Sequence, residues 1–289
     1  MTSAPTAAKV LLFGRISFIM QGQFINYNNS SFHYRVFGNG PKILFCFHGY
    51  GRDSYTFGFL AKYLGKRYTL IAVDAPHHGN TKWDSKVFRP KDLVTILQKI
   101  RTAIGKEAGK ISLLGFSMGG RIALHLTQVL PAQIERVVLL APDGLKFNFW
   151  TWFSTNTWVG HKLFEYTIYH PKWLLRSMNF AERYRFLSKS IVNFVRYYLD
   201  DHEERMVLYR RYIIMRKFNP HLSSIKRTIN KNQIQVRMLF GSLDRIIHSA
   251  SGERFLKKID KYATIQIIDA GHDLLRDYHA HTISELFND

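Results

Sequence analysis

The sequence predicts an α/β protein whose sheet is mostly parallel and doubly wound, with a helical segment inserted late in the chain. Three observations favour this fold class. Short apolar runs recur along the chain, and each ends in a loop rich in glycine and polar residues, as buried parallel strands do. One of these runs passes through a tight turn into a helical pattern. Two later runs are separated by roughly 95 residues, far more than a strand-to-helix connection needs.

The early strands are predicted from apolar runs in the first quarter of the chain. A strand pattern begins near residues 24–27 and recurs at 42–47 and 68–73. The run at 42–47 is followed at once by His48-Gly49-Tyr50-Gly51, a loop whose glycines free its backbone amides. The run at 68–73 leads into a turn-rich loop from Asp74 to Thr81. Both loops are expected at the carboxyl ends of their strands.

The most informative motif is Gly115-Phe116-Ser117-Met118-Gly119. An apolar run at 111–114 precedes it and a helical pattern at 121–130 follows it. Small residues two before and two after the serine let the strand and the helix approach closely, so that the hydroxyl is exposed above the sheet edge. Ser117 is therefore the candidate nucleophile, with Gly115 and Gly119 supporting the turn. The alternative is a serine that only shapes the turn.

A serine hydroxyl is a poor nucleophile at neutral pH unless a histidine takes its proton and an acid orients that histidine. The apolar run at 236–240 opens into a loop that contains Asp244, which is the candidate acid. The run at 264–268 ends in a loop that contains His272, which is the candidate base. Asp143, just after the predicted strand at 136–140, is the alternative acid, and capping of the following helix is the alternative role for His272.

Two backbone amides are expected to meet the negative charge that develops on an attacked carbonyl oxygen. The N–H groups of Tyr50 and Met118 are the candidate oxyanion donors, because they lie in the loop after the strand at 42–47 and directly after Ser117. His48 and Gly49 are expected to shape that loop. His48 is therefore not expected to transfer protons.

With these motifs the chain resembles the α/β-hydrolase family over about residues 24–287. It resembles more narrowly those esterases, lipases and carbon–carbon bond hydrolases that carry a helical cap between the sixth and seventh strands. The resemblance rests on the His48-Gly49 loop, the loop from Asp74 to Thr81, the Ser117 turn, and the Asp244 and His272 loops in that chain order. In the family's pattern Asp-x-Pro-Gly-x-Gly-x-Ser, His77 stands where the first glycine is expected, and Thr81 replaces the serine. This departure changes the wall of the site.

The resemblance implies a serine hydrolase that cleaves an acyl ester through an acyl-enzyme, without a cofactor. A lipid-like or anionic ester is the expected substrate. Three alternatives stay open: a carbon–carbon bond hydrolase or lyase on a keto-acid, a perhydrolase that uses peroxide, and a binding protein on a retired hydrolase fold. His77 and His78 match no helix-spaced metal motif, and the chain has no cysteine cluster, so no metal site is expected.

Composition agrees with a large core in a reducing compartment. The chain has 289 residues, of which 46% are hydrophobic. Its one cysteine, Cys46, excludes an intramolecular disulfide, which predicts a cytoplasmic protein, with peripheral membrane attachment as the alternative. An apolar run at 10–20 is broken by Arg15 and is too short for a membrane span. Met20 as the true start of the protein is a hypothesis.

The expected division is an extension at 1–23, a catalytic core at 24–145 and 232–289, and a basic, aromatic-rich helical cap at 146–231. The cap holds 16 Lys and Arg against 6 Asp and Glu, a net charge of +10, half of the chain's formal +20. It also holds 19 of the 42 aromatic residues. In the simplest interpretation, the aromatic residues seal the cap onto the core and the basic residues face solvent.

In a sharper interpretation, the basic face attracts an anionic substrate or an anionic membrane, while Trp150, Trp152 and Trp158 contact acyl chains. Nucleic-acid binding is not expected, because the basic residues are spread over the cap and no nucleic-acid module is evident. Two cap helices are predicted from apolar residues at steps of three and four. The first contains Phe180, Tyr184, Leu187, Ile191, Phe194 and Tyr198; the second contains Met206, Tyr209 and Ile213, with Asp201 near its start.

Overall fold

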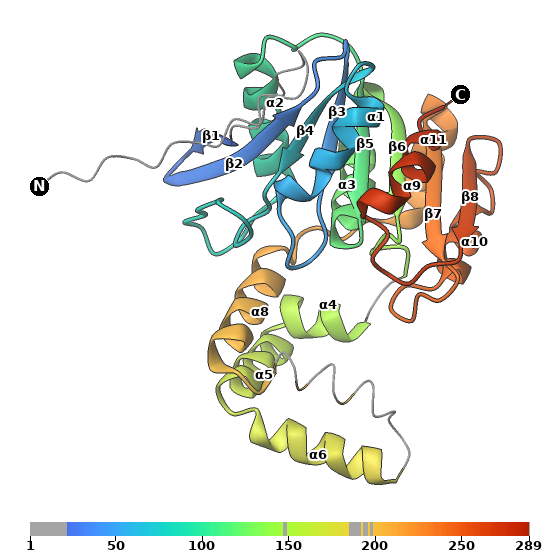
Figure 1. Ribbon diagram of the computed structural model, residues 1–289. Coiled ribbons are helices and arrows are strands. Elements are labelled where there is room, and N and C mark those ends of the chain that lie inside the picture. The colour runs from blue at the N-terminus through green and yellow to red at the C-terminus, as the bar shows by residue number, and fades with distance from the viewer. Residues whose placement is uncertain (1–21, 147–148, 185–191, 193–195, 197–198, 289) are drawn as a thin grey trace, which may run out of the picture.

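The computed structural model describes residues 22–146, 149–184, 192, 196 and 199–288, and an eight-stranded sheet organises it (Figure 1). The strand order is β1-β2-β4-β3-β5-β6-β7-β8. β2 pairs antiparallel with β1 and β4, and the pairs from β4 to β8 are parallel. The bounds are β1 Gly22–Tyr27, β2 Ser30–Phe37, β3 Lys42–Phe47, β4 Tyr68–Val73, β5 Ile111–Phe116, β6 Ile134–Leu140, β7 Gln235–Gly241 and β8 Ala263–Ile268.

The central strands are mostly apolar, and they are buried because helices cover both faces of the sheet. Every residue of β4 and β5 is buried, whereas the edge strand β8 alternates between buried and exposed positions near its start. The predicted strands are confirmed, with ends that differ by two residues or fewer. β2 was not predicted: it is antiparallel and carries polar residues among its apolar ones.

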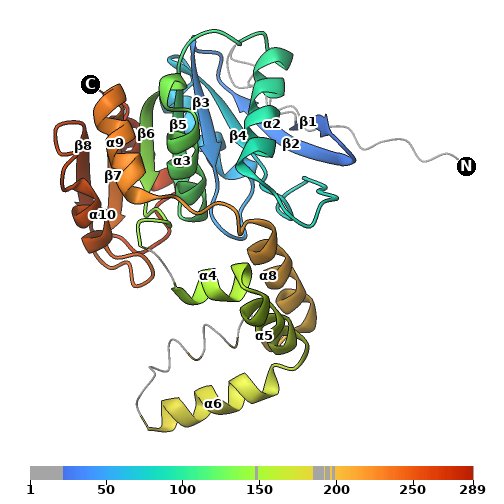
Figure 2. The same ribbon diagram turned by 180° about the vertical axis from the view of Figure 1, so that it is seen from behind.

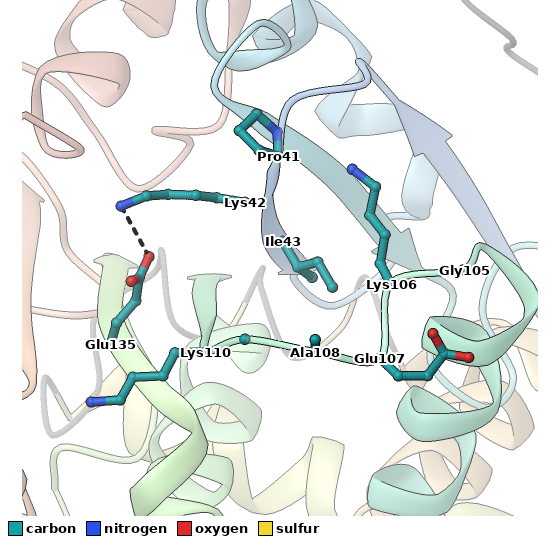
Figure 3. Close-up of a pocket in the computed structure, with 10 residues that line it drawn as sticks. Pro41, Lys42, Ile43, Gly105, Lys106, Glu107, Ala108, Lys110 and Glu135 are labelled. Atoms are coloured by element: carbon teal, nitrogen blue, oxygen red, sulfur yellow. Dashed lines mark ion pairs between the residues drawn. The ribbon is translucent and has the colours of Figure 1, made fainter.

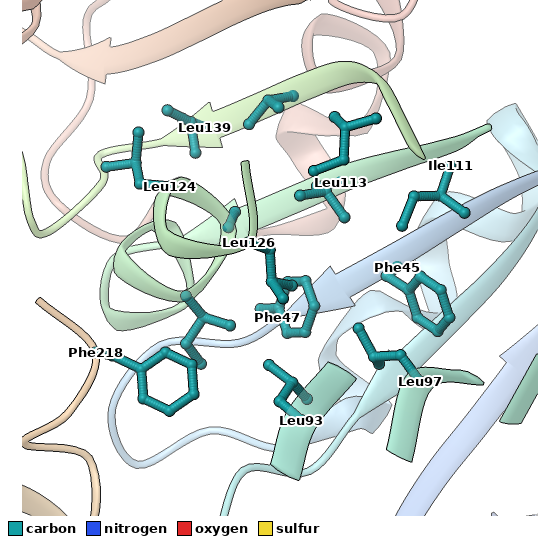
Figure 4. Close-up of a cluster of buried hydrophobic side chains, with 14 of the residues drawn as sticks. Phe45, Phe47, Leu93, Leu97, Ile111, Leu113, Leu124, Leu126, Leu139 and Phe218 are labelled. Carbon is teal, nitrogen blue, oxygen red and sulfur yellow. The ribbon is translucent and has the colours of Figure 1, made fainter. Parts of the chain in front are cut away.

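Two hydrophobic clusters show that the sheet is doubly wound, as predicted. One cluster joins the sheet to α2 Pro90–Ala103, α3 Met118–Val129, α9 Leu222–Asn232 and α10 Ser249–Leu256. Figure 4 shows part of it, where Phe45 and Phe47 of β3 meet Leu93 and Leu97 of α2. The other cluster joins the opposite face to η1 Ser54–Leu60, α1 Ala61–Leu64 and α11 Ala280–Glu285. Two short 3-10 helices, η2 Pro131–Gln133 and η3 Asp277–His279, lie in connections.

Most of the described chain between β6 and β7 is helical. Four of its helices stand away from the sheet in both views: α4 Phe149–Asn156, α5 Trp158–Tyr169, α6 Lys172–Arg183 and α8 His202–Ile214 (Figures 1 and 2). α9 lies within the predicted cap segment, yet its Ile225 and Ile229 belong to the core cluster beneath the sheet. The predicted division into extension, core and cap stays a prediction.

One of the two predicted cap helices is confirmed. Met206, Tyr209 and Ile213 lie in α8, and the Asp201 carboxylate caps its start by accepting a hydrogen bond from Glu204 N at 2.9 Å. The other prediction is wrong at its start, because Phe180 lies in the last turn of α6, which begins at Lys172 and ends before Tyr184. Leu187, Ile191, Phe194 and Tyr198, and the side chain of Trp150, lie outside the described residues.

A helix that crosses a membrane must be both long and apolar. Among the described residues, no helix meets both conditions. The run at 10–20 lies outside the described residues.

Candidate active site

Ser117 lies in a sharp turn between β5 and α3. Its φ of 49° falls in the left-handed region, which is unusual for a residue other than glycine. A Cβ on Gly119 would lie 1.9 Å from Phe47 O, and a Cβ on Gly115 would lie 2.5 Å from Gly119 O. Helix α3 therefore lies too close to β3 and β5 for any side chain at these two positions. α3 begins at Met118, three residues earlier than predicted.

The backbone of Ser117 is fixed by β6 and the loop that follows it. Ser117 N donates to Leu140 O at 3.0 Å, and Ser117 O accepts from Gly120 N at 2.8 Å and from Asp143 N at 2.9 Å. These bonds hold the left-handed conformation in place, because the turn cannot relax without breaking them.

His272 lies within hydrogen-bond reach of both Ser117 and Asp244. Its Nε2 lies 3.0 Å from Ser117 Oγ, and its Nδ1 lies 2.8 Å from Asp244 Oδ2. Because a carboxylate only accepts hydrogen bonds, Nδ1 carries the proton and Nε2 is free to accept one from the serine hydroxyl. The three residues meet because β5, β7 and β8 are parallel, so that their carboxyl ends share one edge of the sheet.

The Asp244 carboxylate is buried and held by backbone amides. Its Oδ1 accepts hydrogen bonds from Ile246 N at 2.8 Å and Ile247 N at 2.9 Å. These two donors leave Oδ2 to face His272. The amide donors fix the orientation of the carboxylate, and the carboxylate in turn positions the imidazole.

Asp143, the alternative acid, has other partners. Its Oδ2 forms an ion pair with Arg121 of α3, and its Oδ1 accepts from Gly144 N at 2.6 Å. Among the described residues, His272 Nδ1 donates its hydrogen bond to Asp244 and not to Asp143. Asp143 contacts the site instead through its backbone N–H on Ser117 O.

The loop after β3 packs against Ser117. A Cβ on Gly49 would lie 3.4 Å from Ser117 Cβ and 2.9 Å from the Phe116 ring, so only glycine lets the loop come this close. Tyr50 follows Gly49 in this loop. Met118 is the first residue of α3, where a backbone N–H has no acceptor within its own helix. The two predicted oxyanion donors thus belong to two segments that both adjoin Ser117.

His48 joins the loops after β3 and β4. Its Nδ1 donates to Gly49 O at 2.7 Å, and its Nε2 accepts from Ala75 N at 3.0 Å. Burial lowers the pKa of His48, which keeps the ring neutral and suits one donor and one acceptor. Both ring nitrogens are engaged, so the geometry fits the predicted role in shaping the loop.

The loop from Asp74 to Thr81 is built around the buried Asp74 carboxylate. Oδ2 lies 2.7 Å from His33 Nδ1 and accepts from Asn80 N at 2.8 Å, while Oδ1 accepts from Ser54 N at 2.6 Å. Burial by itself would raise the pKa of Asp74, but these hydrogen bonds outweigh it and lower the pKa to about 2. His77, at the position where the family has glycine, adopts a φ of 59°.

Two arginines near the site make contacts that were not predicted. Arg211 of α8 donates from Nε to His77 O at 3.0 Å, and its guanidinium carbon lies 5.0 Å from the centroid of the Tyr50 ring. Arg52, in the loop after β3, forms an ion pair at 2.5 Å with Asp273, which is next to His272 in the chain. In the sequence, Arg211 is one of 16 basic residues of the predicted cap and gives no signal of its own. Arg52 and Asp273 lie 221 residues apart, and only their adjacency to predicted site residues could have pointed to them.

One cavity of the described residues lies away from Ser117. Its volume is about 350 Å³, and its lining includes Lys42, Lys106, Lys110 and Glu135 (Figure 3). Lys42 and Glu135 lie at the amino-terminal ends of β3 and β6, so the cavity is at the opposite edge of the sheet from Ser117. Across the residues that the structure describes, no group of three His, Cys, Asp or Glu side chains could hold a metal ion.

Comparison with known proteins gives a consistent family. The family model described as "Alpha/beta hydrolase family" matches residues 43–285. A pimeloyl-[acyl-carrier protein] methyl ester esterase from Nitrosomonas europaea is 28% identical over 125 residues, 43% of this chain and 46% of that protein, so the match spans about half the relative's length. A monoacylglycerol lipase, abhd6-B, from Xenopus laevis is 22% identical over 271 residues, 89% of this chain and 78% of that protein.

Solved structures share the fold at low sequence identity. An enol-lactonase from Burkholderia xenovorans is 16% identical, with a TM-score of 0.61 over 92% of this chain and 100% of that chain. A thermophilic esterase from Thermogutta terrifontis is 16% identical, with a TM-score of 0.63 over 92% of this chain and 97% of that chain. The family match covers well over half of the sequence and agrees with the strand order. The chain belongs to the α/β hydrolase family.

Proposed function

We propose that the protein is a serine hydrolase that cleaves an acyl ester, with Ser117 as nucleophile, His272 as general base and acid, and Asp244 as the acid that orients His272. One observation carries the proposal: His272 Nε2 lies 3.0 Å from Ser117 Oγ while Nδ1 lies 2.8 Å from Asp244 Oδ2. These distances lie within the range over which a base can take the proton of a nucleophile.

Acylation begins when Ser117 Oγ attacks the carbonyl carbon of the ester and His272 Nε2 accepts the hydroxyl proton. Asp244 stabilises the imidazolium that forms, because its buried carboxylate accepts the Nδ1 hydrogen bond. The tetrahedral intermediate collapses when His272 Nε2 gives the same proton to the departing alkoxide. The alcohol leaves, and the acyl group stays on Ser117 as an ester.

The backbone N–H groups of Tyr50 and Met118 stabilise the negative oxygen of the intermediate. Each such donor contributes about 3 to 4 kcal/mol in related enzymes. Met118 N–H also lies at the positive end of the α3 dipole, which favours negative charge there. Water then attacks the acyl-enzyme while His272 Nε2 takes a proton from it. His272 returns this proton to Ser117 Oγ as the acyl bond breaks, which releases the carboxylic acid and restores the serine.

An acyl ester is the substrate class that the relatives favour. They include a methyl ester esterase and a monoacylglycerol lipase, and both names denote enzymes that act on esters. Residues 24–145 and 232–289 supply the catalytic groups in this account, and residues 146–231 form a cap beside them. A cytoplasmic location fits Cys46, which is buried and unpaired with another cysteine.

A panel of p-nitrophenyl esters with acyl chains from two to sixteen carbons tests the proposal. Wild-type protein, Ser117→Ala and the matched control Ser112→Ala are assayed side by side; Ser112 lies in β5 away from the turn. The expected result is hydrolysis by wild type and by Ser112→Ala, with loss in Ser117→Ala. Equal turnover by all three variants, or none on any ester, would contradict the proposal. A keto-acid panel run in parallel would then identify carbon–carbon bond cleavage.

A further inference from the structure

Helix α6 presents a row of aromatic side chains to solvent. Trp173 is 41% exposed, Phe180 is 61% exposed, and Tyr184, the residue directly after the helix, is 56% exposed. Positions 173, 180 and 184 are seven and four residues apart, so their side chains lie on one face. Large aromatic side chains exposed together on one helix mark an interaction surface.

Three basic residues share that face. Lys172, Arg176 and Arg183 are exposed, and their helical positions lie beside those of the aromatic row. The one carboxylate of α6, on Glu182, belongs to the other side of the helix. We call these six residues, Lys172, Trp173, Arg176, Phe180, Arg183 and Tyr184, the α6 face.

The fold of the cap does not need the α6 face. Met178 is buried, and Leu174 and Leu175 are partly buried on the opposite side, so the covered side of α6 is the one that faces away from the aromatic row. In both views α6 lies at the end of the molecule farthest from the sheet (Figures 1 and 2). The aromatic residues of α6 therefore do not seal the cap onto the core.

The preceding helix, α5, also exposes large apolar side chains. Trp158 of α5 is 77% exposed, and Val159, Leu163, Tyr166 and Tyr169 are exposed as well. Their spacing places them on one face of α5, together with Lys162. The exposed acidic residues of the described cap gather instead at the start of α8, at Asp200, Asp201, Glu203 and Glu204. The exposed acidic residues of the described cap thus belong to a different helix from the α6 face.

We propose that the α6 face docks on the surface of an anionic lipid bilayer, with Trp173, Phe180 and Tyr184 in the headgroup region and Lys172, Arg176 and Arg183 against lipid phosphates. Aromatic rings with one polar end favour the membrane interface, and each basic side chain near an anionic surface strengthens binding about fivefold. A helix lying in the interface plane needs this combination rather than a spanning length.

Charge complementarity selects the bilayer over a second copy of the chain. A two-fold dimer through the α6 face would bring the same three cations of each copy against one another. No carboxylate on that face would neutralise them. Anionic lipid headgroups supply the opposite charge, and acyl chains beneath them accept the rings.

Vesicle sedimentation with the full chain tests the proposal. Vesicles of phosphatidylcholine alone are compared with vesicles that contain phosphatidylglycerol. Wild type is expected to bind the anionic vesicles and to dissociate as salt is added. The triple variant Trp173→Ala, Phe180→Ala, Tyr184→Ala is expected to lose at least about tenfold in partitioning. The control variant Phe24→Ala, Tyr55→Ala, Tyr278→Ala removes three exposed rings from the surface of the predicted catalytic core. It should bind as wild type does.

A second pair of variants separates the α6 face from the overall charge. Lys172→Glu, Arg176→Glu, Arg183→Glu is expected to weaken binding to anionic vesicles by at least about 100-fold. The control variant Lys62→Glu, Lys66→Glu, Lys91→Glu changes the net charge by the same amount, at exposed positions of the predicted catalytic core. It should keep most of the binding. Equal losses in the two charge variants, no binding by wild type, or a dimer that the aromatic variant dissociates would overturn the proposal.

The docking proposal is independent of the ester chemistry. Ser117→Ala should bind vesicles as wild type does, since Ser117 belongs to the core turn. Circular dichroism of every variant reports whether the fold is intact. Hydrolysis of a soluble short-chain ester is a second readout for the variants that keep Ser117. Loss of vesicle binding with both readouts unchanged is the expected outcome for the α6 variants.

Discussion

Arg211 of α8 donates a hydrogen bond to the carbonyl oxygen of His77 at 3.0 Å. The same guanidinium lies over the Tyr50 ring, with 5.0 Å between its carbon and the ring centroid. One side chain from a helix outside the sheet therefore contacts the loops after β3 and β4. Because Tyr50 is a proposed oxyanion donor, this contact connects the cap to the catalytic machinery.

Arg211→Met is expected to lower kcat for every ester by about 5- to 30-fold, with little change in KM. The variant loses one hydrogen bond and one cation–π contact, each of about 1 kcal/mol, that hold the loop of Tyr50. Steady-state kinetics on a short and a long ester measure the effect. Arg210→Met is the matched control, because Arg210 is the exposed neighbour on the same helix. Equal kinetics for the two variants would show that Arg211 does not position the loop.

Replacement of the two candidate acids distinguishes their roles. Asp244→Asn is expected to lower kcat by roughly 10³- to 10⁴-fold, because an amide in place of the carboxylate favours the wrong tautomer of the histidine. Asp143→Asn breaks a partly exposed ion pair with Arg121 and is expected to cost less than about fivefold. Turnover of one p-nitrophenyl ester by both variants gives the ratio. The reverse order of effects would assign the acid to Asp143.

Two glycine substitutions test the close approach at the turn. Gly119→Ala is expected to destabilise the fold by about 3 kcal/mol or more, because the new Cβ would lie 1.9 Å from Phe47 O. Gly271→Ala, next to His272, has no heavy atom within 4 Å of the new Cβ and should change stability by less than about 1 kcal/mol. Urea unfolding of both variants measures the difference. Comparable losses would mean that the spacing of strand and helix at Ser117 is not fixed by glycine.

Asp74 is expected to make stability depend on acid pH. Its pKa in the folded protein is about 2, below the ordinary value of 3.8, so folding favours the ionised form. The contribution, about 2 kcal/mol, is complete above the ordinary value and is lost as pH falls from about 4 towards 2, with about half gone at pH 3. Urea unfolding at pH 7, 4 and 3 should show that the difference in unfolding free energy between wild type and Asp74→Asn becomes smaller on acidification. A difference that does not change with pH would contradict the lowered pKa of Asp74.

The sequence predicted those parts of the fold that local pattern determines. Continuous apolar runs such as β4 and β5 are recognisable because parallel strands are buried on both faces. The residues of the proposed triad could be placed in loops at the strand ends, because parallel strands bring those ends to one edge. β2 was missed, since an antiparallel strand near the sheet edge carries polar residues such as Ser30, Ser31 and His33.

Contacts that depend on packing between distant segments could not be predicted. Nothing near Arg211 in the sequence names His77, 134 residues away, as its partner. The first cap helix was placed wrongly because apolar residues lie on more than one side of α6, with Met178 buried and Phe180 exposed. A periodic pattern alone does not say which of these two faces is inside.

Covalent labelling is the most direct test of Ser117 as a nucleophile that His272 activates. Purified protein is treated with a fluorophosphonate probe, and the labelled peptide is identified by mass spectrometry in wild type, Ser117→Ala and His272→Ala. We expect one label per chain on Ser117 in wild type, none in Ser117→Ala, and much slower labelling in His272→Ala. Folded wild-type protein that takes no label, or takes it at a residue other than Ser117, would contradict the proposed nucleophile.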